Sequence, residues 1–167
     1  GGAAEIAFEQ VVRPGDRERF IRVLIDESDH ALAAAMRSLP SSLDDLGVAV
    51  STGRVVDFRA REWLRADPDS MTVPLIYPTH LESGGVAWPK PGSKKPNAIV
   101  CCDDSADLLV SSGTYVLVKR FSAKEERRRI VAAMFDPAAV PCAVVGFENH
   151  LNYYHALGRP LDAALAW

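Results

Sequence analysis

The sequence is poor in cysteine and has no long apolar run. Its 167 residues include three cysteines, Cys101, Cys102 and Cys142. An odd number with one adjacent pair is a poor framework for disulfides, so we expect a reducing, cytoplasmic location. No run of about 18 apolar residues occurs, and no basic segment leads into an apolar one near the start. The sequence therefore predicts neither a membrane span nor a secretory signal.

Motifs for several common chemistries are also missing. There is no Gly-x-Gly-x-x-Gly and no P-loop, so no nucleotide cradle is indicated. No two prolines are adjacent, which excludes the acidic-or-Asn–Pro–Pro–aromatic signature of amino-methylating enzymes. Pro68-Asp69 is followed by no carboxylate-x-Lys, as a Pro-Asp nuclease would need, and no Gly-x-Ser-x-Gly elbow occurs. No catalytic motif is recognised in the chain.

Charge of both signs is present but unevenly placed. The composition, 48% hydrophobic and 25% charged with a net charge of −3, is that of an ordinary globular domain. Residues 1–50 carry 5 basic and 9 acidic side chains, whereas residues 51–129 carry 13 basic and 10 acidic ones. Residues 130–167 are again acidic. The middle of the chain is therefore the candidate anion-facing part.

The first forty residues predict a hairpin and a helix. Residues 5–12 and 19–25 are rich in strand formers and flank the turn signal Arg-Pro-Gly-Asp. Ser28 or Asp29 is a suitable N-cap for the helix that follows. Its expected apolar face has helical spacing and consists of Leu32, Ala35, Met36 and Leu39. A further turn over residues 42–46 is expected to close at Gly47.

The rest of the chain reads as short strands with few helices. Strands are expected at 48–51, 55–58, 74–78, 98–102, 114–121, 128–135 and 143–147. The prolines at both ends of 74–78 favour an edge position. Short helices are expected at 61–65 and 161–167, and residues 82–97 read as a long functional loop. The sequence thus predicts an α+β fold, a twisted, mostly antiparallel sheet with helices packed on it.

The strongest chemical signal is the basic segment 119–129. It holds six basic and two acidic residues in eleven positions. Ser122 and Glu125 fit a helix-capping box, but β-branched residues on both sides favour a hairpin with a charged tip. Phosphate is the natural partner of such clustered guanidinium groups. The alternative is a solvated hairpin tip that only aids solubility.

Three further segments carry polar groups suited to nucleic acid. Residues 51–53, Ser-Thr-Gly, lie beside Arg54 and Arg59 and are able to grip a phosphate, or else form a tight turn. Trp88, Lys94 and Lys95 lie in the long loop, where an aromatic residue among lysines resembles a loop that contacts nucleic acid. The alternative is an ordinary Pro-rich linker. Residues 146–155 are dense in amide, imidazole and phenol groups. They either read bases and contact phosphates or form an internal hydrogen-bond network.

A metal site has only weak support. Its candidate ligands are Cys101, Cys102, Cys142, His150 and His155, but their spacing matches no zinc pattern. Buried, structural cysteines are the simpler expectation.

Several segments, taken in order, resemble one family. They are 50–59 (VSTGRVVDFR), 74–80 (PLIYPTH), 88–89 (WP), 95–97 (KPN), 115–125 (YVLVKRFSAKE) and 147–155 (FENHLNYYH). Together they resemble the C-terminal part of adenine-specific DNA methyltransferases of bacterial restriction–modification systems, over roughly residues 42–167. The resemblance implies a target-recognition domain that follows an S-adenosylmethionine-binding catalytic core. That core and its motifs are absent here.

We therefore expect one domain over residues 1–167, excised from a longer enzyme. Residues 1–41 form its hairpin and helix, and residues 42–167 form the target-recognition region. The expected partners are double-stranded DNA and the methyltransferase core, with no membrane, and no cofactor is expected in this fragment. The alternatives are a scaffold or subunit-interaction domain that does not touch DNA, and a nuclease in its own right. The candidate DNA-binding residues are Arg54, Arg59, His80, Lys94, Lys95, Lys119, Arg120, Lys124, Arg127, Arg128, Asn149, His150 and Asn152.

Overall fold

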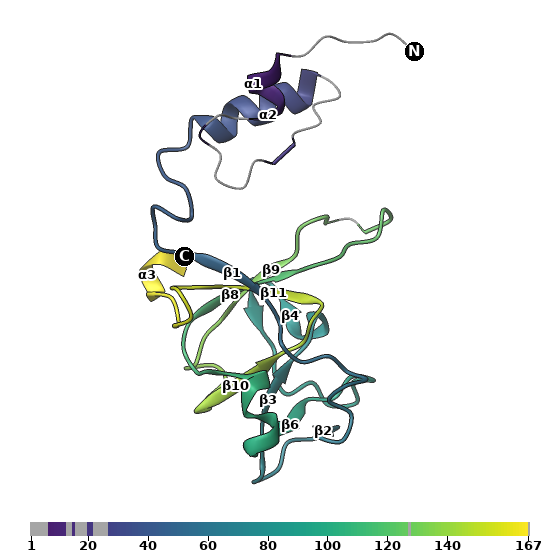
Figure 1. The fold of residues 1–167 in the computed structure, drawn as a ribbon. Helices are drawn as coiled ribbons and strands as arrows, with labels where there is room; N and C mark the ends of the chain where they lie inside the picture. The colour runs from purple at the N-terminus through teal and green to yellow at the C-terminus, as the bar shows by residue number, and fades with distance from the viewer. Residues whose placement is uncertain (1–6, 13–14, 16–19, 22–26, 127, 167) are drawn as a thin grey trace. The chain divides into compact units, whose positions relative to one another are not determined.

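A computed structural model describes residues 7–12, 15, 20–21, 27–126 and 128–166 (Figure 1). The chain divides into two compact units, Gly1–Ser42 and Leu43–Trp167. The prediction of one domain stays a prediction. No helix in the described part of the chain is long and apolar enough to cross a membrane.

The first unit contains two described helices, α1 (Phe8–Val11) and α2 (Glu27–Arg37). The strand predicted over 5–12 is wrong where it is described, because Phe8–Val11 is helical. Most of its predicted partner and turn lie outside the described residues. Helix α2 confirms the predicted helix. However, the side chains of its expected apolar face, Leu32 and Met36 among them, are exposed.

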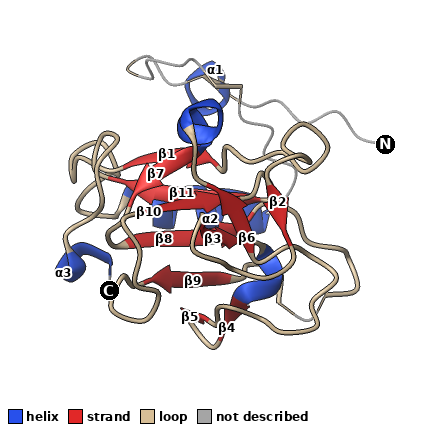
Figure 2. Ribbon diagram, turned by 90° about the horizontal axis from the view of Figure 1, so that it is seen from below, coloured by secondary structure: helices blue, strands red, loops and turns tan. Residues whose placement is uncertain are grey.

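The second unit is mostly β, with three mainly antiparallel sheets and few described helices (Figures 1 and 2). A four-stranded sheet has the order β1-β11-β8-β9, a five-stranded sheet the order β2-β6-β3-β10-β7, and β4 pairs with β5. The strands are β1 (Ala49–Thr52), β2 (Leu64–Arg65), β3 (Thr72–Ile76), β4 (Leu81–Glu82), β5 (Gly85–Val86), β6 (Ala98–Val100), β7 (Leu109–Ser111), β8 (Tyr115–Lys119), β9 (Ala132–Phe135), β10 (Val144–Phe147) and β11 (Leu151–His155). Two 3-10 helices, Pro78–His80 and Asp103–Leu108, and α3 (Ala163–Ala166) complete this unit.

The inner strands of the five-stranded sheet, β6, β3 and β10, are largely buried on both faces. Successive residues of β3 enter different cores: Ile76 packs with Leu117 and Phe147, whereas Leu75 packs with Val55 and others. This follows from the two-residue repeat of a strand. Strand β3 therefore lies in the middle of its sheet, between β6 and β10. The predicted edge position was wrong, because the apolar run between the prolines reflects two-sided burial.

The expected antiparallel pairing is confirmed, but three sheets form where one was expected. The predicted hairpin of 114–121 with 128–135 appears as β8 paired with β9. Residues 55–58 form no strand beyond an isolated bridge from Val55 to Glu148. The helix predicted at 61–65 is a turn followed by β2, since Leu64 pairs with Ile99 of β6 and tertiary pairing overrides local preference.

Candidate functional site

The β8–β9 hairpin meets the turn between β10 and β11. The backbone N–H of Arg120 donates to the carbonyl oxygen of His150 at 2.8 Å, just beyond the ladder that pairs Lys119 with Leu151. The Arg120 guanidinium Nη1 also donates to the carbonyl oxygen of Asn149 at 3.4 Å. Three of the predicted DNA-binding residues, Arg120, Asn149 and His150, are thereby brought together.

The hairpin carries exposed positive charge, and the competing helix does not form. Residues 122–126 are not helical, so the hairpin prediction is confirmed. Lys119 is neutralised by an ion pair with Glu126 at 2.6 Å, whereas Lys124 and Arg128 are exposed. The guanidinium of Arg120 lies 4.9 Å from the centre of the Phe121 ring. Arg127 lies outside the described residues.

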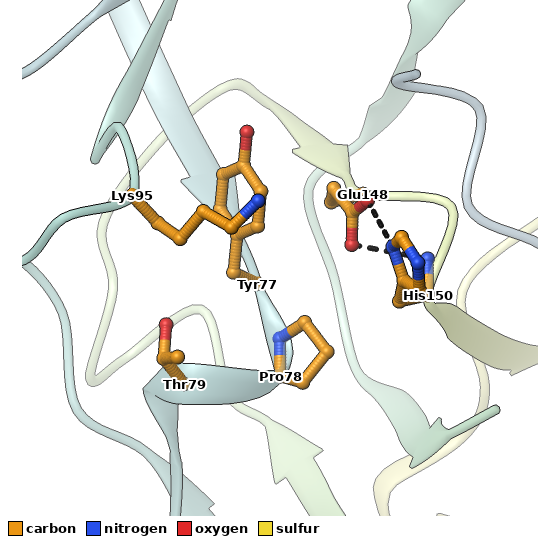
Figure 3. A pocket seen from close by; sticks show the side chains of 6 residues that line it. All are labelled: Tyr77, Pro78, Thr79, Lys95, Glu148 and His150. Carbon is orange, nitrogen blue, oxygen red and sulfur yellow. Dashed lines mark hydrogen bonds and ion pairs between the residues drawn. The ribbon is translucent and has the colours of Figure 1, made fainter. Parts of the chain in front are cut away.

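A pocket of about 210 Å³ adjoins this surface (Figure 3). Tyr77, Pro78 and Thr79 enter from the end of β3 and the 3-10 helix, and Lys95 comes from the long loop. Its remaining lining residues, Glu148 and His150, come from the turn after β10. Figure 3 shows Tyr77 and Pro78 between Lys95 on one side and Glu148 and His150 on the other.

Lys95 is held over Tyr77 by Asp57. The Asp57 carboxylate accepts from the Tyr77 hydroxyl at 2.7 Å and from Lys95 Nζ at 2.8 Å, and Lys95 Nζ lies 5.2 Å from the Tyr77 ring centre. Partial burial alone would raise the pKa of Asp57. The hydrogen bonds from Lys95 and Tyr77 outweigh it, so this pKa lies below its usual value. Burial, together with Asp57, raises the pKa of Tyr77.

Glu148 places a carboxylate inside the fold at the edge of the pocket. Its side chain is 1% exposed and accepts from the His150 backbone N–H at 3.0 Å and from His150 Nδ1 at 2.5 Å. The imidazole itself is half exposed. Removing a carboxylate from water is expensive unless it is hydrogen-bonded, and here His150 provides both bonds.

His80 and Asn97 form a buried support behind the pocket. His80 Nδ1 accepts from the Tyr77 backbone N–H at 2.9 Å, so its Nε2 donates to Asn97 Oδ1 at 3.0 Å. Burial lowers the pKa of His80, in keeping with a neutral ring. Because His80 has no exposed surface, its side chain is not available to DNA in this structure. It fixes the backbone of Tyr77 instead.

Arg54 and Arg59 line a different hollow of about 140 Å³, together with Trp63 and others. Both arginines are exposed. Arg54 Nη1 donates to the carbonyl oxygens of Asp107 and Leu109, at 3.3 and 3.2 Å. Arg59 lies over the ring of Phe58.

The remaining predicted residues are dispersed. Lys94 is exposed, and Asn152 on β11 accepts a hydrogen bond from the Thr52 hydroxyl at 3.2 Å. The expectation of buried cysteines is wrong, because Cys101 and Cys102 are exposed and Cys142 is partly exposed. Among the described residues, no group of three His, Cys, Asp or Glu side chains is arranged to hold a metal ion.

Sequence reasoning missed Asp57, Tyr77, Thr79 and Glu148 as members of the site. Glu148 had a usable signal: it follows the apolar residues of β10 directly and precedes a histidine by two positions. Asp57 had none, because its partners Tyr77 and Lys95 are 20 and 38 positions away in the chain.

The lowered pKa of Asp57 gives a pH prediction for Lys95→Met. A depressed carboxyl pKa stabilises the fold above the unfolded pKa, about 3.9. The stabilisation is lost as the pH falls through the folded value. We expect wild type to be more stable than Lys95→Met at pH 7 and the difference to vanish toward pH 2. Urea unfolding across this range measures it. Lys94→Met removes the same charge at the neighbouring position, and its stability difference from wild type should not vanish in this way. Equal pH profiles for both variants would show that Lys95 does not lower the pKa of Asp57.

Comparison with known proteins shows homology over nearly the whole chain. The chain is 45% identical over 162 residues to the Type II methyltransferase M.PstI of Providencia stuartii. It is 46% identical over 148 residues to the Type II methyltransferase M.BsuBI of Bacillus subtilis. These matches cover 97% and 89% of the chain but only 32% and 29% of the relatives, so the chain spans about a third of their length. No protein-family model and no solved structure matches it.

Proposed function

We propose that this chain recognises the DNA target of a Type II, adenine-specific DNA methyltransferase of a restriction–modification system. The observation that carries the proposal is the meeting of two kinds of group on one surface. The basic hairpin supplies Arg120, Lys124 and Arg128, and the adjoining turn supplies Asn149 and His150. Homology to part of two Type II methyltransferases supports the same assignment.

The two kinds of group suit the two tasks of DNA recognition. Phosphate contacts from lysine and arginine provide affinity and position the protein, but they carry no sequence information. Amide and imidazole groups are able to read base edges in the major groove. Arg54, Arg59, Lys94 and Asn152 are proposed as further contacts from neighbouring loops and strands.

Catalysis is assigned to a part of the enzyme outside this chain. S-adenosylmethionine would supply the methyl group there. Neither of the two hollows described above, of about 210 and 140 Å³, reaches the size of ordinary small-molecule sites, roughly 300–1,000 Å³, so neither would hold the whole cofactor. This chain's own role is to bind and orient the DNA for the attached core.

Removing charge from the hairpin tests the proposal. In the intact methyltransferase we expect the triple variant Arg120→Ala, Lys124→Ala and Arg128→Ala to weaken duplex binding about 10- to 1,000-fold near 0.1 M salt. The slope of log affinity against log salt should fall by about 2–3, since each lost phosphate contact removes about 0.9. Fluorescence anisotropy with a labelled duplex, titrated at several salt concentrations, measures both quantities.

A control variant removes the same charge elsewhere. Arg37, Arg61 and Arg159 are exposed, and changing all three to alanine should leave the salt slope near the wild-type value. If the two triple variants bind DNA equally well, the domain does not hold DNA through this hairpin. A scaffold role within the enzyme would then be favoured.

A further inference from the structure

We propose that the pocket formed by Tyr77, Pro78, Thr79, Lys95, Glu148 and His150 is a subsite for one nucleobase of the bound DNA. In it, His150 donates or accepts the hydrogen bond that reads the base. Glu148 is a positioning residue that acts through His150. This inference rests on the proposed DNA-binding function and assigns one base position to one set of side chains.

The size and lining of the pocket suit a single flat ring system. Its volume of about 210 Å³ is below that of ordinary small-molecule sites, roughly 300–1,000 Å³. Pro78 lines the pocket and lies between Thr79 and His150, below Tyr77 in the view of Figure 3. The partly exposed Pro78 offers an apolar surface against which the face of a base would pack, whereas a phosphate or a free carboxylate would gain nothing from it. The ring of Tyr77 is only 1% exposed and forms the floor of the pocket.

The Glu148–His150 pair is arranged to present one ring nitrogen. Glu148 is buried and accepts from both the backbone N–H and Nδ1 of His150, which fixes the position and the rotation of the imidazole. Nδ1 is thereby occupied. Nε2 makes no hydrogen bond with any described residue, and 55% of the side chain is exposed. Packing alone does not require a buried carboxylate that orients an exposed imidazole. The arrangement therefore suggests that His150 Nε2 is held in place for a ligand.

Polar groups also approach the space from the opposite side. Lys95 Nζ is held there by Asp57, and the Thr79 hydroxyl, which lines the same pocket, has no hydrogen-bond partner among the described residues. A base carries donors and acceptors along its edge, so groups on both sides of the pocket suit it. Arg120 contacts the backbone of His150, and a phosphate bound by Arg120 therefore belongs to a nucleotide near the pocket.

The test is a set of double-mutant cycles between side chain and base in the intact methyltransferase. A random-sequence duplex library first identifies the preferred sequence. Duplexes of that sequence, each with one base removed to leave an abasic site, are then bound to wild type, His150→Ala and Glu148→Gln. At one position, removing the base should weaken wild-type binding about 5- to 100-fold. It should weaken neither variant further, because their contact with that base is already lost.

Controls separate this proposal from DNA binding in general. The hairpin variant Lys124→Ala should weaken binding to every duplex by a similar factor, and Thr79→Val should couple, more weakly, to the same base as His150→Ala. Since Glu148→Gln changes a buried group, circular dichroism checks its folded fraction, and His150→Ala and Thr79→Val carry the test if it fails to fold.

Two results would overturn the subsite. If the loss of DNA affinity caused by His150→Ala is the same with and without the base at every position, the pocket contacts no base. DNA binding that still depends on the hairpin would in that case leave the proposed function intact. Saturable binding of free adenosine that His150→Ala abolishes would instead assign the pocket to a nucleoside rather than to DNA.

Discussion

Replacing Gly53 by alanine is expected to destabilise the second unit by about 3 kcal/mol or more. A Cβ at this position would lie 2.2 Å from the carbonyl oxygen of Glu148 and 2.5 Å from that of Phe147. Both are backbone atoms, one at the end of β10 and one at the start of the turn that carries the site, so no flexible side chain is able to move aside. The Gly53 N–H also donates to the Leu151 carbonyl oxygen at 2.8 Å, which holds the two segments in contact.

Thermal unfolding followed by circular dichroism measures this effect. For a chain of this size, about 3 kcal/mol corresponds to a fall in melting temperature of roughly 10 °C. Gly85→Ala is the matched control, because a Cβ there would meet its nearest atom at 3.9 Å and its φ is ordinary. A change at Gly53 no larger than that at Gly85 would contradict the close packing of β1 against the Glu148 turn.

Gly53 also corrects the interpretation of residues 51–53 as a phosphate grip. The Gly53 amide is bonded to Leu151, the Ser51 hydroxyl lies 2.9 Å from His155 Nε2, and Thr52 bonds to Asn152. Their polar groups therefore have partners within the fold, and Ser51 and Thr52 belong to strand β1 rather than to the tight turn of the alternative. A glycine is needed at position 53 because the backbone of Phe147 and Glu148, at the end of β10, passes next to it.

Asn97→Asp is expected to cost about 3–5 kcal/mol of folding free energy. The Asn97 side chain is buried and uses its full hydrogen-bonding capacity. Oδ1 accepts from the Lys90 backbone N–H and from His80, and Nδ2 donates to the carbonyl oxygens of Ala66 and Lys90 at 2.8 and 3.2 Å. An aspartate of the same shape has no such donors and would place a buried carboxylate against two carbonyl oxygens.

Denaturant unfolding of both variants at pH 7 measures the difference. Asn149→Asp makes the same chemical change at a partly exposed position and should alter stability by no more than about 0.5 kcal/mol. If Asn97→Asp lowered the stability no more than Asn149→Asp, the long loop would not depend on the hydrogen bonds of the Asn97 side chain. Because His80 and Asn97 hold the backbone around Tyr77, we also expect Asn97→Asp to weaken DNA binding through the pocket.

The sequence predicted the features that rest on local patterns. The β8–β9 hairpin followed from β-branched residues on both sides of a charged turn, and α2 followed from helical spacing of its apolar residues. Strand β11 is not predicted from the sequence, although Leu151, Tyr153 and His155 alternate inward, because its many polar groups favour either a recognition segment or an internal hydrogen-bond network. The alternation with a period of two residues is present in the sequence, but the polar composition of the segment obscures it.

The candidate site was only partly predictable for the same reason. Arg120, Asn149 and His150 were named from composition, but their contact depends on the register of β8 with β11. His80 was placed among the DNA-binding residues because it ends the segment 74–80, which resembles the methyltransferase family. Its burial follows from Asn97 and Tyr77, which only the packed long loop brings to it. Pairings between distant segments leave no local signal.

The most direct test of DNA recognition by this chain is hydrogen exchange of the intact protein with and without its preferred duplex. We predict that DNA slows exchange most in the peptides covering residues 115–135 and 146–152, the basic hairpin and the turn that carries Glu148 and His150. Slowed exchange confined to parts of the enzyme outside this chain would contradict the account. It would identify the chain as a scaffold that the DNA does not touch.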